Sequence, residues 1–352
     1  MTSVIGWDLG GANLKLARIE GGEVRDAAQV PCPIRQDRGK FDAALAQALS
    51  LCPPGAVHAV TMTGELSDVF SDRAEGVAYL VEMMRKATDD EALFYAGRSG
   101  FFDYIRAAEC ANDVASANWH ASAAFVAQCI PDGLFLDVGT TTTDLIPLKG
   151  GNVAARAFAD GERMAERELI YTGAVRTPLM AIARSVPFKG RMQGVAAERF
   201  ATMADVWRLL GELPAGADPY PTPDLKGKTT QESAVRLARM LGRDLADAGL
   251  LAVTDAARHF AACQLAEIEA AAQSLCARED IGADAPVIGA GCGRFIAKKI
   301  AERLGRPYRD FADLIACDPR LGEAVAACAP AVAVGLLAES EVLLPSARRV
   351  IQ

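Results

Sequence analysis

Short apolar segments alternate with longer segments of helical periodicity along most of the chain. Apolar and β-branched residues run together at 57–63, 92–96 and 134–138, which predicts buried strands. Apolar residues three and four positions apart predict helices over 40–51 and 111–129. Strands that alternate with helices in this way are typical of an α/β fold.

Two hairpins repeat one pattern of residues. The first spans 4–24 and reads VIGWDLGGANLKLARIEGGEV, and the second spans 135–153 and reads FLDVGTTTTDLIPLKGGNV. When Asp8 is aligned with Asp137, the glycine two positions later and the distant Gly-Gly pair also coincide. Each copy is a strand ending in Asp-x-Gly, a small-residue turn, a second strand and a Gly-Gly turn. This duplication predicts two phosphate-binding loops that face each other across a cleft.

The chemistry of the two turns suits phosphate. Glycine lets an anion approach the backbone N–H groups, and consecutive N–H groups in a turn form an anion-binding concavity. Backbone, hydroxyl or ammonium donors are expected from Gly10, Gly11, Lys15, Gly139, Thr140, Thr141, Thr142 and Thr143. Asp8, Asp137 and Asp144 would repel phosphate directly, so we expect them to act through Mg²⁺. An ordinary β-hairpin with glycine in its turn is the alternative for either copy alone.

The second half of the sequence contains an additional segment. Residues 186–220 include Phe-Lys-Gly, a predicted helix near 201–210 and a proline-rich stretch, which together are typical of an insertion or lid.

Ser67, in the first half, is expected to cap a helix that runs toward Ala87. Further helices are predicted at 230–241 and 252–277.

A third glycine-rich turn follows the predicted strand that ends at Ile288. Gly289, Gly291 and Gly293 form this turn, and a helix is expected to start near Arg294. Such a turn before a helix favours an anion or a nucleotide. Arg294 stands where the third glycine of G-x-G-x-x-G belongs, so close packing of the helix on the strand is an equal alternative.

Composition narrows the class of protein. The 352 residues allow two domains, and 51% hydrophobic residues allow a sizeable core. The net charge of -8 argues against nucleic acid as a partner, because phosphate backbones need a basic surface. No signal peptide and no bilayer-spanning apolar run are expected, so no membrane partner is predicted. Nine scattered cysteines without a C-x-x-C pair favour free thiols in the cytoplasm.

Other motifs carry no chemistry. Gly227, Lys228 and Thr229 look like the end of a P-loop, but its earlier glycine is replaced by Thr222. The sequence has no G-x-S-x-G elbow. The histidines lack metal spacing, and a structural role is the better interpretation for His58, His120 and His259.

Distinctive blocks throughout the chain carry a resemblance to a known family. The matching blocks are IGWDLGGANLK (5–15), TMTGELSD (61–68), SANWHASA (116–123), FLDVGTTTTDLIP (135–147), YTGAVRTP (171–178), FKG (188–190) and TPDLKGK (222–228). The chain resembles the hydantoinase A/oxoprolinase-like proteins linked to the tetrahydromethanopterin one-carbon pathway. This branch includes the methanofuran-biosynthesis condensing enzyme, and it lies in the superfamily of sugar kinases, Hsp70 and actin.

The resemblance implies both a fold and a reaction. The fold would be two RNase H-like α/β lobes around a central cleft, with limits at 1–130 plus 330–352 and at 131–329. The insertion would span 186–230, and the apolar helix 330–338 would return to the first lobe. The enzyme would be an ether-forming transferase dependent on Mg²⁺. The phenol of γ-glutamyltyramine, or of a tyrosine analogue, would displace pyrophosphate from an aminomethylfuran-methyl diphosphate.

The resemblance also assigns roles to residues. The diphosphate would be held by Gly10, Gly11, Asn13, Lys15, Gly139, Thr140, Thr141 and Thr142, together with Gly289, Gly291 and Gly293. The Mg²⁺ ligands would be Asp8, Asp137 and Asp144, and the catalytic residues would be Asp8, Lys15, Glu65 and Asp137. Glu65 would act as the base or bind the substrate amine. Asn118, Arg176 and Thr177 would contact substrate. A surface ion pair for Arg176 and a helix hydrogen bond for Asn118 are the alternatives.

Two other functions remain open. An ATP-dependent kinase or ATPase of the same superfamily predicts ATP turnover and a need for the Gly289 turn. A non-catalytic nucleotide-binding regulator predicts tight nucleotide binding without turnover. Leu225, in the TPDLKGK block, occupies a turn position that would favour glycine. Self-association into a homo-oligomer is also left open.

Overall fold

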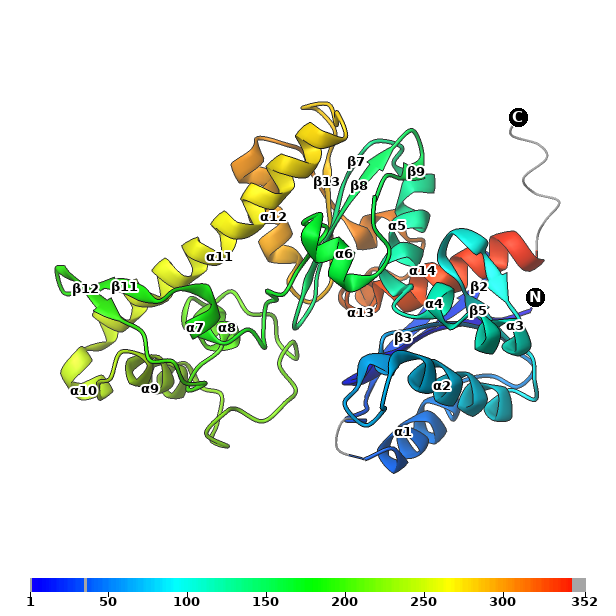
Figure 1. Ribbon diagram of the computed structural model, residues 1–352, viewed down its shortest axis with the longest axis horizontal. Helices are drawn as coiled ribbons and strands as arrows, with labels where there is room; N and C mark the ends of the chain where they lie inside the picture. Colours follow the sequence, from blue (N-terminus) through cyan, green and yellow to red (C-terminus); the bar gives the residue numbers. More distant parts are fainter. Residues whose placement is uncertain (1, 35–36, 344–352) are drawn as a thin grey trace. The chain divides into compact units, whose positions relative to one another are not determined.

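The computed structural model describes residues 2–34 and 37–343, which form two compact α/β units (Figure 1). Among the described residues, the first unit contains those up to Pro131, Gly150–Val153 and those from Phe311 to Leu343. The second contains Asp132–Lys149 and Ala154–Asp310. The predicted α/β class is confirmed. The lobe limits inferred from the sequence remain predictions, and their last part, 344–352, lies outside the described residues.

The first unit is built on a sheet with strand order β3-β2-β1-β4-β5-β6, in which β1 pairs antiparallel with β2 and parallel with β4. Its elements are β1 (Val4–Leu9), β2 (Asn13–Glu20), β3 (Glu23–Pro31), α1 (Gly39–Leu49), β4 (Val57–Met62), α2 (Arg73–Ala87), β5 (Ala92–Tyr95), β6 (Phe101–Phe102), α3 (Tyr104–Glu109), α4 (Ala111–Val114), α5 (Asn118–Cys129), β9 (Asn152–Val153), α13 (Gly322–Ala327) and α14 (Ala329–Ala338).

Helix α14 packs directly on the central strand of this sheet. A Cβ atom at Gly6 on β1 would overlap the carbonyl oxygen of Ala331, so the helix and strand backbones touch. After the helix, the Glu339 carboxylate accepts hydrogen bonds of 2.7 Å from the N–H groups of Gly21 and Gly22. Helix α14 is almost entirely buried. The sequence correctly predicted an apolar helix here.

The described helices were compared with the length and hydropathy that a membrane span requires. No single helix among them is long and apolar enough to cross a membrane. Pro319–Ala327 and Ala329–Glu341 reach that length and hydropathy together, but they meet at a bend of 100°.

The second unit repeats the strand arrangement of the first. Its sheet has the order β10-β8-β7-β13-β14, with β7 antiparallel to β8 and parallel to β13. Its elements are β7 (Gly133–Val138), β8 (Thr143–Lys149), α6 (Asp160–Ala165), β10 (Leu169–Ile170), α7 (Leu179–Ile182), β11 (Ser185–Phe188), β12 (Arg191–Gly194), α8 (Met203–Leu209), α9 (Thr230–Met240), α10 (Leu245–Ala248), α11 (Leu250–Arg278), β13 (Val287–Ala290), α12 (Arg294–Leu304) and β14 (Tyr308–Asp310).

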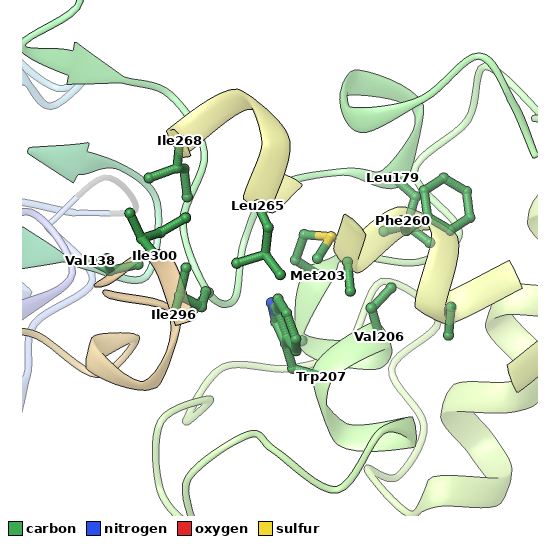
Figure 2. Packing of buried hydrophobic residues seen from close by; sticks show 14 of the residues in the cluster. Val138, Leu179, Met203, Val206, Trp207, Phe260, Leu265, Ile268, Ile296 and Ile300 are labelled. Carbon is green, nitrogen blue, oxygen red and sulfur yellow. The ribbon is translucent and has the colours of Figure 1, made fainter. Parts of the chain in front are cut away.

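The core of the second unit lies along the 29-residue helix α11. Figure 2 shows the indole of Trp207, from α8, among Met203, Val206 and Leu265. Helix α12 packs beside α11 and against β13. The additional segment predicted at 186–230 contains hairpin β11–β12 and helix α8, and its buried residues share one apolar core with the sheet.

Two local predictions for the first unit were wrong. Helix α2 is capped by Asp72, whose side chain accepts from the N–H of Glu75, and Ser67 instead follows a 3₁₀ turn at Gly64–Leu66. The helix expected over 111–129 is broken into α4 and α5. Ser116, between them, adopts a left-handed backbone with φ of 52°, which no helix interior allows.

Two of the histidines are packed against aromatic rings. His58 accepts a hydrogen bond of 3.0 Å from Trp7 Nε1 at Nδ1. His120 Nδ1 lies 2.9 Å from the hydroxyl of Tyr95. Both imidazoles are buried, which agrees with the structural role inferred from the sequence.

Candidate functional site

The turns of the two repeated hairpins are closed by the same backbone hydrogen bond. The N–H of Gly10 donates to the carbonyl of Asn13 at 3.1 Å, and the N–H of Gly139 donates to the carbonyl of Thr142 at 2.9 Å. These residues correspond in the alignment of Asp8 with Asp137. The repeat in sequence is therefore also a repeat in structure, and it includes the hydrogen bond that closes each turn.

In the first unit, Asp8 and Lys15 face each other across β1 and β2. Lys15 Nζ lies 3.4 Å from Asp8 Oδ2, and only 4% of the Asp8 side chain is exposed. Burial raises the pKa of Asp8, and the ion pair with Lys15 opposes that shift. Asp8 Oδ1 and the hydroxyl of Thr61, its neighbour on β4, are both buried without a hydrogen-bond partner in the described chain.

This arrangement around Asp8 fits Mg²⁺. A buried carboxylate oxygen without a partner is destabilising unless a cation or water satisfies it. Mg²⁺ is usually held by one or two carboxylates, with water and substrate phosphates as its other ligands. Such a site needs no cluster of three protein side chains, and none is found among residues 2–34 and 37–343.

In the second unit, the equivalent positions carry two acids. Asp137 on β7 lies opposite Asp144 on β8. Arg163, which is buried, donates from Nη1 to Asp144 Oδ1 at 2.8 Å. Burial raises the pKa of Asp144, and Arg163 opposes that shift. One oxygen of Asp144 therefore accepts from Arg163, and its second oxygen has no hydrogen bond to Arg163.

The block 172–177 packs against the threonine-rich turn. The N–H groups of Ala174 and Arg176 donate to the carbonyls of Gly139 and Thr140, at 2.9 and 2.7 Å. Arg176 Nη1 also lies 3.5 Å from Thr141 Oγ1. The structure therefore brings Arg176 to the predicted phosphate turn, although these residues are far apart in the sequence.

Thr177 supports the same block from within. Its buried hydroxyl accepts from the N–H of Gly173 at 2.8 Å. A Cβ atom at Gly173 would lie 2.6 Å from the carbonyl carbon of Thr140 and from the nitrogen of Thr141. Thr177 therefore shapes the segment that contacts the turn.

Close packing accounts for all three glycines of the third turn. A Cβ atom at Gly291, where φ is 79°, would overlap Asp137 Oδ1 and the carbonyl of Val138. A Cβ at Gly293 would lie 2.5 Å from Val138 Cγ1, and one at Gly289 would lie 2.6 Å from the Tyr308 hydroxyl. Phosphate binding by this turn remains a prediction, and the contact between Gly291 and Asp137 places the turn beside the end of β7.

Glu65 lies under helix α2 rather than at the surface. Only 1% of this residue is exposed, and its Oε1 accepts from the Ser116 hydroxyl at 2.6 Å. A Cβ atom at Gly76 on α2 would overlap the backbone of Glu65. The preceding Gly64 packs on the Gly10–Gly11 turn. The roles of Glu65 as base or amine ligand remain predictions.

Asn118 begins helix α5 and is partly exposed. Its carbonyl accepts from the Ser122 hydroxyl at 3.4 Å. This contact leaves its predicted role in substrate binding untested.

Sequence reasoning missed several residues around the second unit's turn. Arg163, Trp207 and Gln264 are all buried. Arg163 donates to Asp144, Trp207 donates to Gln264, and Gln264 donates to the 172–177 block. Arg163 and Gln264 are polar residues within helices α6 and α11. A polar residue at a core-facing helical position is the signal that could have found them.

Leu225 has the backbone that the sequence suggested for glycine. Its φ is 56°, and 83% of the residue is exposed. Next to it, Asp224 accepts from Arg236 Nη1 at 3.2 Å, and Arg236 is fully buried. On the other side of Leu225, the carbonyl of Lys226 accepts from the Thr222 hydroxyl at 2.8 Å, so the loop is held on both sides of this strained apolar residue.

Comparison with known proteins places the chain in a family. The hydantoinase/oxoprolinase family model matches residues 56–315, well over half of the chain, and the protein belongs to this family. A protein of Methanocaldococcus jannaschii is 31% identical over 242 residues, which cover 68% of this chain and 72% of that protein. It is named (4-{4-[2-(gamma-L-glutamylamino)ethyl]phenoxymethyl}furan-2-yl)methanamine synthase.

Two further similarities were found, one in sequence and one in fold. A Methanococcus vannielii protein of the same name is 36% identical over 124 residues, which cover 35% of this chain and 55% of that protein. Nucleotide-free acetone carboxylase is similar in fold, with a TM-score of 0.57 and 10% identity over 95% of this chain and 70% of that one. The likeness to acetone carboxylase concerns the fold alone.

Proposed function

We propose that this protein is a condensing enzyme of methanofuran-type biosynthesis. It joins an aminomethylfuran-methyl diphosphate to the phenol of γ-glutamyltyramine or a tyrosine analogue, and it releases pyrophosphate. The main support is the 31% identity to the M. jannaschii synthase over 68% of the chain. The Asp-x-Gly turns of both units supply groups suited to a diphosphate.

Binding of the leaving group is assigned to the two hairpin turns. In the second unit, the hydroxyls and N–H groups of the Thr140–Thr142 turn and the guanidinium of Arg176 donate to phosphate oxygens. In the first unit, Lys15 and the turn at Gly10, Gly11 and Asn13 do the same. Donors that are already in place stabilise the charge that develops on a departing diphosphate.

The metal is assigned to the acidic positions of the hairpins. Asp8, Asp137 and Asp144 are the proposed Mg²⁺ ligands, and the unpartnered Oδ1 of Asp8 is the observation that favours this assignment. When bound, Mg²⁺ neutralises diphosphate charge and makes pyrophosphate a better leaving group.

The bond changes are those of a substitution at carbon. The phenol oxygen bonds to the furan-methyl carbon while the bond from that carbon to the diphosphate oxygen breaks. The bonding electrons leave with pyrophosphate, and the phenol proton passes to a base. A free phenol has a pKa of about 10, so the site must lower that value or supply the base. Glu65 and Asn118 are the candidates from the first unit for the base and for substrate contact.

The test is ³¹P NMR of the protein with Mg²⁺, the furan diphosphate and γ-glutamyltyramine, with tyrosine in a second sample. We expect pyrophosphate to appear only when a phenol is present. A sample with ATP alone provides the comparison. If the diphosphate stays intact while ATP is cleaved, the function is that of a kinase or ATPase rather than a synthase. Tight ATP binding without any turnover would favour a regulator.

A matched pair of variants links the turnover to the proposed site. Asp137→Asn removes a proposed metal ligand and should abolish pyrophosphate release. Asp284→Asn changes an exposed acid of the same unit and should leave the release unchanged.

A further inference from the structure

Gln264 is a polar residue at the centre of an apolar helix face. It lies on α11 with no exposed surface, among core residues that include Phe260, Leu265 and Ile268. A buried amide is destabilising unless its donors and acceptor are all used. Gln264 satisfies this condition fully.

The Gln264 amide connects α8 to the block beneath the threonine-rich turn. Its Oε1 accepts from Trp207 Nε1 at 3.0 Å. Its Nε2 donates to Thr172 Oγ1 at 2.7 Å and to the carbonyl of Gly173 at 2.9 Å. The indole of Trp207 is itself fixed in the core shown in Figure 2.

Gly173 contacts both Gln264 and the threonine-rich turn. Its α-carbon is packed so tightly against Thr140 and Thr141 that a side chain would not fit. The next residue, Ala174, donates its N–H to the carbonyl of Gly139. The hydroxyl of Thr143, at the other end of the turn, donates to the carbonyl of Thr172 at 2.6 Å. A shift of the Gly173 carbonyl would therefore move the turn.

An apolar side chain at position 264 would fill the core equally well. It would leave Trp207 Nε1 buried without its present acceptor and the Gly173 carbonyl with only the longer bond of 3.4 Å from the Thr177 hydroxyl, and both losses are destabilising. The amide is neutral, so it makes these hydrogen bonds without adding charge near the turn.

We propose that Gln264 is a positioning residue for the phosphate-binding turn Gly139–Thr142. By holding the Gly173 carbonyl, Gln264 sets the positions of the Thr140 and Thr141 donors. This inference rests on the proposed function, in which the turn binds a diphosphate. Gln264 itself touches no substrate.

The experiment measures binding of inorganic pyrophosphate with Mg²⁺ by isothermal titration calorimetry, together with thermal unfolding. For Gln264→Met, Kd should rise about tenfold or more, as expected when a buried hydrogen bond that orders the binding groups is lost. Trp207→Phe removes the hydrogen bond on the opposite side of Gln264. It should lower Tm but change Kd by less than about twofold. Gln273→Met, on the exposed side of α11, should change neither.

Each outcome decides the question. Equal pyrophosphate affinity in Gln264→Met and the wild-type protein, with only a lower Tm, would overturn the positioning role and leave the proposed function intact. Absence of pyrophosphate binding by the wild-type protein would instead overturn the diphosphate role of the turn and the inference with it. If Gln264→Met does not fold, Gln264→Asn keeps the amide but shortens the side chain, so that it no longer reaches the Gly173 carbonyl. An unchanged Kd in that variant would overturn the inference.

Discussion

Asp137 and Asp144 lie opposite each other on β7 and β8, at the positions that Asp8 and Lys15 occupy on β1 and β2. Like charges at directly opposite positions are destabilising unless a cation lies close by. The first hairpin carries its own cation, whereas the second depends on Arg163 from α6. The two repeats have therefore diverged in charge while keeping the same turn.

The pair of Asp144 and Arg163 should matter for stability. Asp144→Asn would leave the buried guanidinium of Arg163 without its carboxylate, and we expect a loss of about 3 kcal/mol in the free energy of unfolding. Urea denaturation measures this loss. Asp284→Asn, at an exposed acid, is the control. Equal midpoints for the two variants would mean that the pair contributes little.

Lys15 should be needed for anion binding by the first hairpin. Lys15→Met removes the cation next to Asp8, so the pKa of Asp8 should rise further and the hairpin should attract phosphate less strongly. We expect pyrophosphate affinity, measured by calorimetry with Mg²⁺, to fall about tenfold. Lys86→Met, at a lysine paired with Glu82 on the surface of α2, should not change the affinity. A similar drop in both variants would indicate a general charge effect.

Gly173→Ala tests the contact between the 172–177 block and the threonine-rich turn. The added methyl group would lie 2.6 Å from atoms of Thr140 and Thr141, so one segment must move. We expect a loss of stability of about 1–3 kcal/mol and at least about tenfold lower turnover. Gly161→Ala in α6 has open space around the new methyl group, and it should be neutral or slightly stabilising. Wild-type turnover in Gly173→Ala would show that the turn tolerates displacement.

His58 should make the first unit sensitive to acid. Burial lowers the pKa of His58 from 6.5 to about 4 in the folded protein. Below pH 6.5 the unfolded chain binds a proton that the folded chain does not. Stability is therefore fully present above pH 6.5, falls as the pH drops to about 4, and then levels off, with a total loss on the order of 3 kcal/mol.

The His58→Gln variant isolates this effect. Glutamine can still accept from Trp7 Nε1, but it does not titrate. Urea unfolding at pH 7 and at pH 4 should show a smaller loss of stability in the variant than in the wild-type protein. Identical losses would assign the acid sensitivity to other groups.

Leu225 and Leu251 should respond in opposite directions to replacement by glycine. Left-handed backbone costs a leucine about 1–2 kcal/mol, so Leu225→Gly should stabilise the protein by about 0.5–1 kcal/mol after the entropy cost of glycine. Leu251 is also exposed but lies in α11, where glycine is unfavourable by about 1 kcal/mol. Thermal unfolding separates the two. A lower Tm for Leu225→Gly would mean that the exposed side chain makes stabilising contacts.

Local signals in the sequence predicted the repeated hairpins well. The Asp-x-Gly turns, the Gly-Gly turns and the alternating elements depend on neighbouring residues, and both sheets confirm them. The cap of α2 was assigned to Ser67 rather than Asp72 because a 3₁₀ turn separates the preceding strand from the helix. Either residue type can cap a helix, so composition alone does not choose between them.

The supporting groups of the candidate site were not predictable in the same way. Gln264 bonds to Thr172, which lies 92 positions earlier in the chain, and Glu65 bonds to Ser116, which lies 51 positions later. Such pairs form only after the helices have packed on the sheet. One sequence carries no signal for the partner, although a polar residue in an apolar helical face indicates that some partner exists.

The packing of α14 on β1 has a consequence for how the chain is made. On the ribosome, β1 is synthesised first. Helix α14, whose Gly335 packs against Gly6 of β1, is among the last described segments to emerge. The whole second unit is translated in between. One face of β1 therefore stays uncovered until α14 has been synthesised. The second unit is complete before that point, so it can fold before the first unit does. Chaperone binding to nascent chains halted before residue 329 would reveal that delay.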